Sequence, residues 1–228
     1  MKSQSADWLI AAADSSAGRS REPPASGVVG GWLGDRSVER PAAGVHLFTR
    51  LKQENPIMGL FSKTKKFDSL ECLFIDQLRD LYDAEQRITK ALPKMIEAAH
   101  SPGLKSAFEH HLKETAVQVN RLEEIFKSLG KEAKAETCEA MQGLLTEGDE
   151  VIAATGDPVV RDAALIAAAQ RVEHYEMAGY GCARTFAERL GHKDAAALLQ
   201  KTLDEEGAAD KKLTAIAEQS INMEASRK

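Results

Sequence analysis

The chain has 228 residues, of which 43% are hydrophobic and 29% charged, with a formal net charge of -5 at pH 7. This length allows one full-sized hydrophobic core or two small ones. The acidic balance argues against a protein that coats nucleic acid, since phosphate binding needs a dense basic surface. We therefore expect no nucleic-acid partner.

The sequence also predicts neither a membrane-spanning segment nor a disulfide framework. No stretch approaches the roughly 18 consecutive apolar residues of a membrane span, and the apolar run after Trp8 is too short for a signal peptide. We expect a cytoplasmic protein that does not bind membranes. Cys72, Cys138 and Cys182 are odd in number and form no Cys-x-x-Cys pair, so we interpret them as reduced, small core residues.

The first 57 residues differ in composition from the rest. They hold both tryptophans, four of seven prolines and six of sixteen glycines, with no sustained periodicity. We expect residues 1–57 to be a disordered N-terminal extension. Purine-rich codons for residues 52–54 would resemble a translated ribosome-binding site, which suggests a natural start at Met58. A genuine disordered tail is the competing interpretation.

The first helical hairpin is predicted from caps and prolines. Strong 3.6-residue periodicity begins after Met58, and the first helix is expected over residues 68–99 with a kink at Pro93. The second helix starts with Ser101 as N-cap and Pro102 at the first helical position. It is expected to end at Gly130.

The second half of the chain predicts another hairpin after a long connection. A shorter amphipathic helix is expected over residues 135–154, within a connection too long for a tight turn. Asp157 and Pro158 then begin a helix that ends at Leu190, and a last helix is expected over residues 194–222. Two antiparallel helical hairpins joined by a long crossover are typical of an all-α, ferritin-like four-helix bundle, here residues 58–228 with an additional short helix.

Acidic residues interrupt the apolar stripes of the four long helices. The carboxylates predicted to face the bundle core are Glu85, Glu114, Glu173, Glu176, Glu206 and Asp210. Counted from the two hairpin turns at about 1.5 Å per residue, all of them lie about 20 to 28 Å along the bundle, so they share one level. Carboxylates from four helices at one level are the usual cage for two iron or manganese ions.

An internal network is the alternative to a metal. Burying several uncompensated carboxylates would cost several kcal/mol each. In that alternative, Arg121, Arg171 or a hydroxyl such as Tyr82 or Tyr180 neutralises some acids, and the others remain protonated. The coincidence of level acids on four helices favours the metal.

Three motifs resemble a known family. Residues 81–85 (Leu-Tyr-Asp-Ala-Glu), 111–115 (His-Leu-Lys-Glu-Thr) and 172–176 (Val-Glu-His-Tyr-Glu) are similar to the ferritin-like stress proteins of the YciF and YciE type, and the resemblance covers residues 58–228. It implies a four-helix bundle with an additional short helix, a homodimer, the bacterial cytoplasm and expression linked to stress. It implies no well-established catalytic activity.

The histidines of the wider ferritin and rubrerythrin superfamily are missing here. Where that pattern offers histidine on the second and fourth helices, this chain has Val117, Ala209 and Asp210. We expect an oxygen-rich centre to which His111 contributes instead, while His174 is expected at the surface or a subunit contact. The hypothesis is a dinuclear iron or manganese site that reacts with dioxygen or peroxide. The alternative is a metal-free dimeric stress or scaffold protein that acts through its surface.

Overall fold

The computed structural model describes residues 65–228; the predicted extension, residues 1–57, lies outside the described residues, as do residues 58–64. The described part is helical and contains no strand. Its long helices are α1 (Leu70–Ala98), α2 (Pro102–Ser128), α3 (Glu139–Ala153), α4 (Pro158–Leu190) and α5 (Lys193–Ile216). A π-helical turn, Ala217–Ile221, and the short helix α6 (Asn222–Ala225) continue from α5. None of the helices in residues 65–228 is long and apolar enough to cross a membrane.

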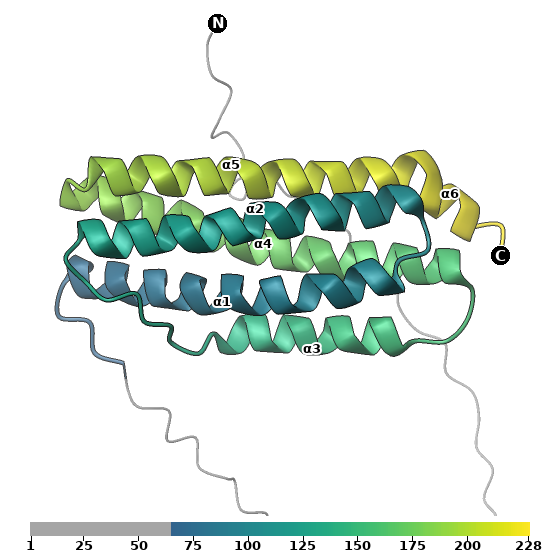
Figure 1. Cartoon of the computed structure of the whole chain (residues 1–228), viewed down its shortest axis with the longest axis horizontal. Helices are drawn as coiled ribbons and strands as arrows, with labels where there is room; N and C mark the ends of the chain where they lie inside the picture. The colour runs from purple at the N-terminus through teal and green to yellow at the C-terminus, as the bar shows by residue number, and fades with distance from the viewer. Residues whose placement is uncertain (1–64) are drawn as a thin grey trace, which may run out of the picture. The chain divides into compact units, whose positions relative to one another are not determined.

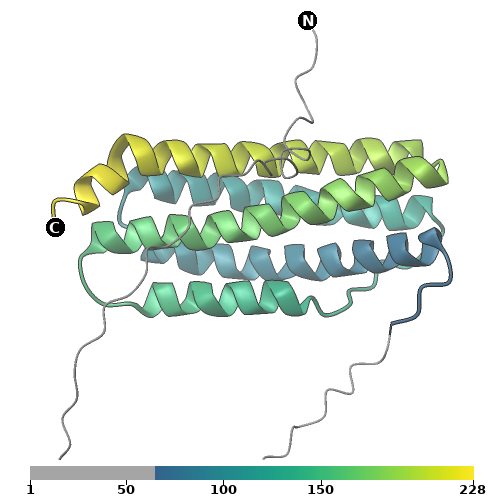
Figure 2. The ribbon, with the colours of Figure 1, turned by 180° about the vertical axis from the view of Figure 1, so that it is seen from behind.

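Four of these helices form a bundle of two antiparallel hairpins. Helices α1 and α2 form one hairpin and α4 and α5 the other, and the hairpins pack together through α1 against α4 and α2 against α5 (Figures 1 and 2). Helix α3 lies outside this square, along α1 and α4, within the crossover that joins the hairpins (Figure 1). The predicted fold class, a ferritin-like four-helix bundle with an additional short helix, is confirmed.

The helix ends follow the predicted capping chemistry, with small shifts. Helix α1 begins two residues later than expected because the Ser69 hydroxyl accepts a hydrogen bond from the Cys72 amide. Helix α4 begins as predicted, with the Asp157 carboxylate accepting from the Val159 amide at 2.8 Å. It ends at Leu190 and is capped by Gly191, whose φ of +83° is the left-handed conformation that glycine adopts without strain.

Two predicted helices are shorter in the structure. Helix α3 begins at Glu139 rather than at residue 135, because the Cys138 thiol caps it by accepting from the Met141 amide. The last predicted helix is regular only to Ile216, where the π-helical turn replaces the α-helical pattern. Neither a sulfur cap nor a π-turn has a strong sequence signal, so periodicity alone extends both helices too far.

The core consists of two apolar clusters separated by a layer of buried polar side chains. One cluster, including Phe74, Leu78 and Phe126, fills the end of the bundle where α1 and α5 begin. The other, including Leu92, Phe108 and Leu213, fills the opposite end. The buried polar side chains include Glu85, His111, Thr115, Gln118, Arg121, Glu173, Glu176, Thr202 and Glu206.

The predicted burial of the cysteines is correct for one of them only. Cys138 is buried, and its sulfur lies 2.9 Å from the Tyr175 hydroxyl oxygen. Cys72 and Cys182 are exposed, so their assignment to the core was wrong. Both lie on helices whose apolar stripe faces elsewhere, and cysteine's small size lets it occupy a solvent-facing position at little cost.

Candidate metal centre

Five acidic or histidine side chains from all four bundle helices are buried in the polar layer. They are Glu85 on α1, His111 on α2, Glu173 and Glu176 on α4, and Glu206 on α5, none more than 6% exposed. One possible ligand atom from each of His111, Glu173, Glu176 and Glu206 lies within 4.8 Å of all the others. We call these four residues together with Glu85 the carboxylate–histidine cluster.

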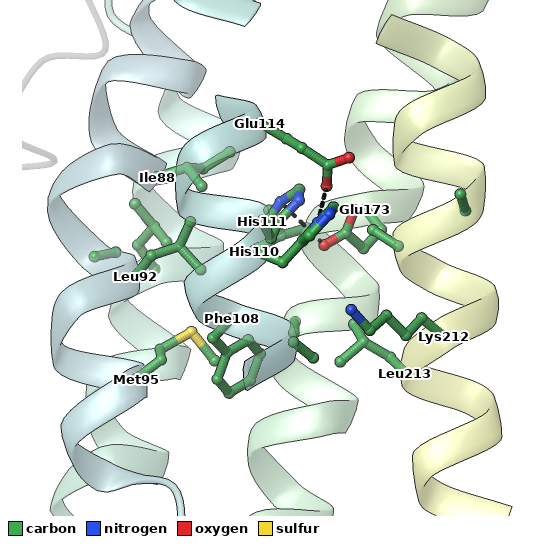
Figure 3. A pocket seen from close by; sticks show the side chains of 17 residues that line it. Ile88, Leu92, Met95, Phe108, His110, His111, Glu114, Glu173, Lys212 and Leu213 are labelled. Carbon is green, nitrogen blue, oxygen red and sulfur yellow. Dashed lines mark hydrogen bonds and ion pairs between the residues drawn. The ribbon is translucent and has the colours of Figure 1, made fainter. Parts of the chain in front are cut away.

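His111 faces two of these carboxylates directly. Its Nε2 atom lies 3.4 Å from Oε1 of Glu173 and 3.9 Å from Oε2 of Glu206. Figure 3 shows the imidazole of α2 and the carboxylate of α4 pointing toward each other. The placement of His111 is therefore compatible with the expectation that it contributes in place of the missing superfamily histidine, and its role as a ligand stays a prediction.

Glu85 is held in the cluster by a tyrosine. The fully buried Tyr180 hydroxyl donates a short hydrogen bond to Oε1 of Glu85, while Oε2 has no partner within the described residues. Tyr180 lies one turn after Glu176 on α4. Helix α4 therefore supplies both the Glu176 carboxylate and the hydroxyl that orients Glu85 of α1. The prediction that Tyr82 or Tyr180 reaches the ligands is correct through Tyr180; Tyr82 bonds Glu123 instead, at 2.7 Å.

Most polar atoms of the cluster lack a hydrogen-bond partner in residues 65–228. Both oxygens of Glu176, both of Glu206 and both nitrogens of His111 are unpaired, as is one oxygen each of Glu85 and Glu173. Buried polar groups in folded proteins are nearly always paired, because each unpaired one costs about 1–3 kcal/mol, and charged groups cost more. A bound cation would give a partner to several of these carboxylate oxygens and to one nitrogen of His111.

Burial shifts the protonation of the cluster strongly. Desolvation, reinforced by the neighbouring carboxylates, raises the pKa of Glu85, Glu176 and Glu206 well above the usual range and the pKa of Glu173 to about 8. Desolvation also lowers the pKa of His111 to about 4. The imidazole is therefore neutral at physiological pH, which is the form that binds metals.

The other two predicted ligands lie at the edge of the cluster. Glu114 is 30% exposed, and its Oε2 lies 2.9 Å from Nδ1 of His110 (Figure 3). Asp210 accepts a hydrogen bond from Gln170 at 2.9 Å and lies 3.3 Å from Nε2 of the exposed His174. The structure does not bring these two carboxylates into the group of ligand atoms, and their role as ligands stays a prediction.

The proposed neutralising network is formed only in part. Arg121 is buried, but its guanidinium binds Glu205 at 2.8 and 3.1 Å and also donates to Thr202. Arg171 donates to a backbone carbonyl of its own helix. Neither arginine bonds a carboxylate of the cluster, although the charge of Arg121 lowers the pKa of Glu85 against the larger effect of desolvation.

Glu205 and Thr202, the acceptors of Arg121, were not among the residues predicted from the sequence. Gln118 of α2 also donates a hydrogen bond to Glu205 of α5, at 3.2 Å, so these two helices are linked beside the cluster. Thr202 lies one helical turn before Glu206 on α5, and this spacing was the available signal.

The fold and the cluster define the chain as an all-α bundle with a buried carboxylate–histidine group that could hold a metal. Residues 69–226 match the family described as "Domain of unknown function (DUF892)", and the chain belongs to this family. It is 47% identical over 161 residues to Protein YciF of Escherichia coli strain K12, covering 70% of this chain and 97% of that protein. The resemblance based on the three motifs is confirmed.

Solved crystal structures agree with this assignment. The E. coli stress protein YciF superposes with a TM-score of 0.66 at 46% identity, covering 68% of this chain and 99% of that one. YcfI from Rhodopseudomonas palustris, whose description proposes a structural protein, has a TM-score of 0.65 at 46% identity over 69% of this chain and 99% of that one. A protein from Xanthomonas campestris pv. campestris shares the fold at 19% identity, with a TM-score of 0.56 over 70% of this chain and 98% of that one.

Proposed function

We propose that this chain is a stress-response protein whose bundle core binds two iron or manganese ions through the carboxylate–histidine cluster. The observation that carries the proposal is the set of buried ligand atoms on four helices that have no hydrogen-bond partner in residues 65–228. One ligand atom from each of His111, Glu173, Glu176 and Glu206 lies within 4.8 Å of the other three. Carboxylate oxygens with imidazole nitrogen suit hard or intermediate divalent ions such as these. The stress role is carried from YciF, which is called a stress protein.

The chain's own residues would prepare this site in three ways. Tyr180 fixes the orientation of Glu85, and the lowered pKa of His111 keeps a nitrogen lone pair available. The apolar clusters on either side keep bulk water from the carboxylates. A bound pair of reduced ions would supply electrons for the reduction of dioxygen or peroxide, which makes oxidase-like or peroxidase-like activity the reaction to assay.

Compartment and assembly are part of the same proposal. We place the protein in the cytoplasm, because three free cysteines, two of them exposed, are compatible with a reducing compartment. We propose a homodimer in solution without nucleic-acid or membrane partners. Size-exclusion chromatography with light scattering distinguishes a dimer from a monomer and from a larger shell.

A metal-free scaffold is the second candidate. It is favoured by the description of YcfI as a structural protein and by Val117, which is 52% exposed at the position where the superfamily pattern offers a histidine. In that case the acids stay protonated in the folded chain, and the outer surface binds a partner.

Equilibrium metal binding separates the two candidates. We expect isothermal titration with Mn²⁺ at pH 7 to show binding to the wild type and none to Glu176→Ala. Glu188→Ala, which removes an exposed acid of the same helix, is the matched control and should bind as the wild type does. Equal binding by Glu176→Ala, or none by the wild type with either manganese or anaerobic ferrous iron, would remove the metal proposal.

A further inference from the structure

A pocket of about 100 Å³ opens beside the carboxylate–histidine cluster, between the two hairpins. Its walls are mainly apolar and include Leu92 and Met95 of α1, Phe108 of α2 and Leu213 of α5 (Figure 3). Apolar walls of this kind are typical of sites for organic molecules rather than for a hydrated ion. We call this space the α2–α5 pocket.

Two polar side chains of the cluster form part of the pocket wall. His111 and Glu173 are both more than nine-tenths buried, and both line the pocket. Neither nitrogen of His111, and only one oxygen of Glu173 at most, has a hydrogen-bond partner in residues 65–228. A molecule in the pocket therefore lies directly against groups that we propose as metal ligands.

One lysine supplies the free charge at the pocket. Lys212 extends from α5 toward the pocket (Figure 3), and no hydrogen bond or ion pair within residues 65–228 engages its ammonium group. The other ionisable side chains at this side of the pocket, His110 and Glu114 of α2, are already engaged with each other at 2.9 Å. Lys212 is therefore the charged group at the outer side of the pocket that has no partner among residues 65–228.

The volume limits what can enter. A cavity needs about 10–15 Å³ to hold one water molecule, and an engineered apolar cavity of about 150 Å³ binds benzene. A pocket of about 100 Å³ therefore accommodates a hydrocarbon chain of roughly four to six carbons, with any headgroup remaining near the surface.

We propose that the α2–α5 pocket binds a short-chain organic monoanion, with its headgroup paired to Lys212 and its hydrocarbon chain against Met95 and Phe108. The chain places carbon atoms beside His111 and Glu173. As the substrate class of the metal site, this inference rests on the proposed function. Binding itself requires only the protein, so it is tested on the metal-free chain.

Methionine methyl groups provide a local probe of binding. Met95 lines the pocket, whereas Met223 is 52% exposed and lies outside it. In the full-length protein labelled with ¹³C-methyl methionine and kept in EDTA, titration with hexanoate should shift the Met95 resonance and leave Met223 unchanged. The Met95→Leu variant identifies the resonance.

Four variants and two comparison molecules test the contacts. Lys212→Gln should weaken hexanoate binding at least threefold and Lys212→Arg should retain it, while the neighbouring exposed Lys211→Gln should bind as the wild type does. Ala209→Leu, which places a larger side chain in the partly exposed pocket wall, should abolish the Met95 shift. Hexan-1-ol and hexylammonium should bind more weakly than hexanoate.

The outcomes separate the two proposals. Equal affinity for hexanoate and hexan-1-ol, full binding by Lys212→Gln, or no Met95 shift would overturn the pocket inference whether or not metal binds. Repeating the titration on zinc-loaded protein tests whether the pocket and the metal site can be occupied together, and hexanoate should still shift the Met95 resonance. Hexanoate binding by a chain that takes up no metal would support the pocket and remove the metal proposal alone.

Discussion

Replacing Glu176 by glutamine should stabilise the metal-free protein. The side chain is 1% exposed, both its oxygens are unpaired, and desolvation followed by the charges of Glu85, Glu206 and Glu173 raises its pKa well above the usual 4.5. The metal-free folded state therefore keeps this carboxyl protonated at neutral pH, while the unfolded chain releases the proton. Glutamine keeps the size and the buried polar atoms but needs no proton.

The magnitude follows from the two protonation states. When the pKa of Glu176 in the folded state lies above the solution pH, keeping its carboxyl protonated lowers the free energy of unfolding by about 1.4 kcal/mol for each pH unit above 4.5. This gives up to about 3 kcal/mol at pH 7. The same cost is below about 1 kcal/mol at pH 5. Because the unfolded state loses its proton first, the free energy of unfolding of the metal-free wild type should fall as pH rises above 4.5. The increase in the free energy of unfolding that Glu176→Gln brings should grow over the same pH range.

Thermal unfolding measures this directly. Circular dichroism at 222 nm in EDTA should show a Tm for Glu176→Gln that is higher by roughly 6–12 °C at pH 7 and by little at pH 5. Excess Mn²⁺ should raise the Tm of the wild type, by the equivalent of about 2.7 kcal/mol at a hundred times Kd, and that of the variant far less. Glu188→Gln on the same helix is the control. A lower Tm for Glu176→Gln at pH 7 in EDTA would refute the reasoning, because it would mean that the carboxylate stabilises the metal-free fold.

Four further substitutions test contacts within the bundle. Tyr180→Phe removes the only side-chain hydrogen bond of Glu85 within residues 65–228, so chemical denaturation should show a loss of about 1–3 kcal/mol in the free energy of unfolding and Mn²⁺ titration a weaker affinity. Gly179→Ala places a Cβ 2.8 Å from a methyl group of a buried leucine on α1, whereas a Cβ at Gly181 meets nothing within 4 Å. Gly181→Ala should therefore raise the free energy of unfolding by roughly 1 kcal/mol, and Gly179→Ala should be less stable than Gly181→Ala by at least about 1 kcal/mol. Asp162→Ala removes the buried acceptor of two backbone amides in the α1–α2 turn, at 2.6 and 2.7 Å, and should cost about 3 kcal/mol in urea unfolding. Equal stability of the two glycine variants, or an unchanged midpoint for either other variant, would contradict these assignments.

Periodicity and capping residues were enough to predict the four-helix architecture. Helix α4 shows why: Asp157 and Pro158 determine its start, and Gly191 its end, by strictly local chemistry. The inward direction of Glu173 and Glu176 follows from the same 3.6-residue spacing, since both interrupt the apolar stripe of a single helix.

The choice among neighbouring polar residues could not be made from spacing. His111 and Glu114 differ by about 60° around α2, so both are close to the inward face, and only the pairing of Glu114 with His110 shows which one is buried. Asp210 continues the stripe of Glu206, but a hydrogen bond from Gln170 on the neighbouring helix holds it. Contacts between helices decide these positions, and a single-helix pattern does not contain them.

Metal content per chain tests the central claim most directly. The full-length protein is incubated anaerobically with ferrous iron, loosely bound metal is removed, and iron is quantified by mass spectrometry against protein concentration. The account predicts about two iron ions per chain for the wild type, because ligand atoms from α2, α4 and α5 meet within 4.8 Å and the buried Glu85 of α1 acts electrostatically on Glu176 in the same cluster. Iron-free protein, with the same result for manganese and zinc, would contradict it and identify the carboxylate–histidine cluster as a protonated network.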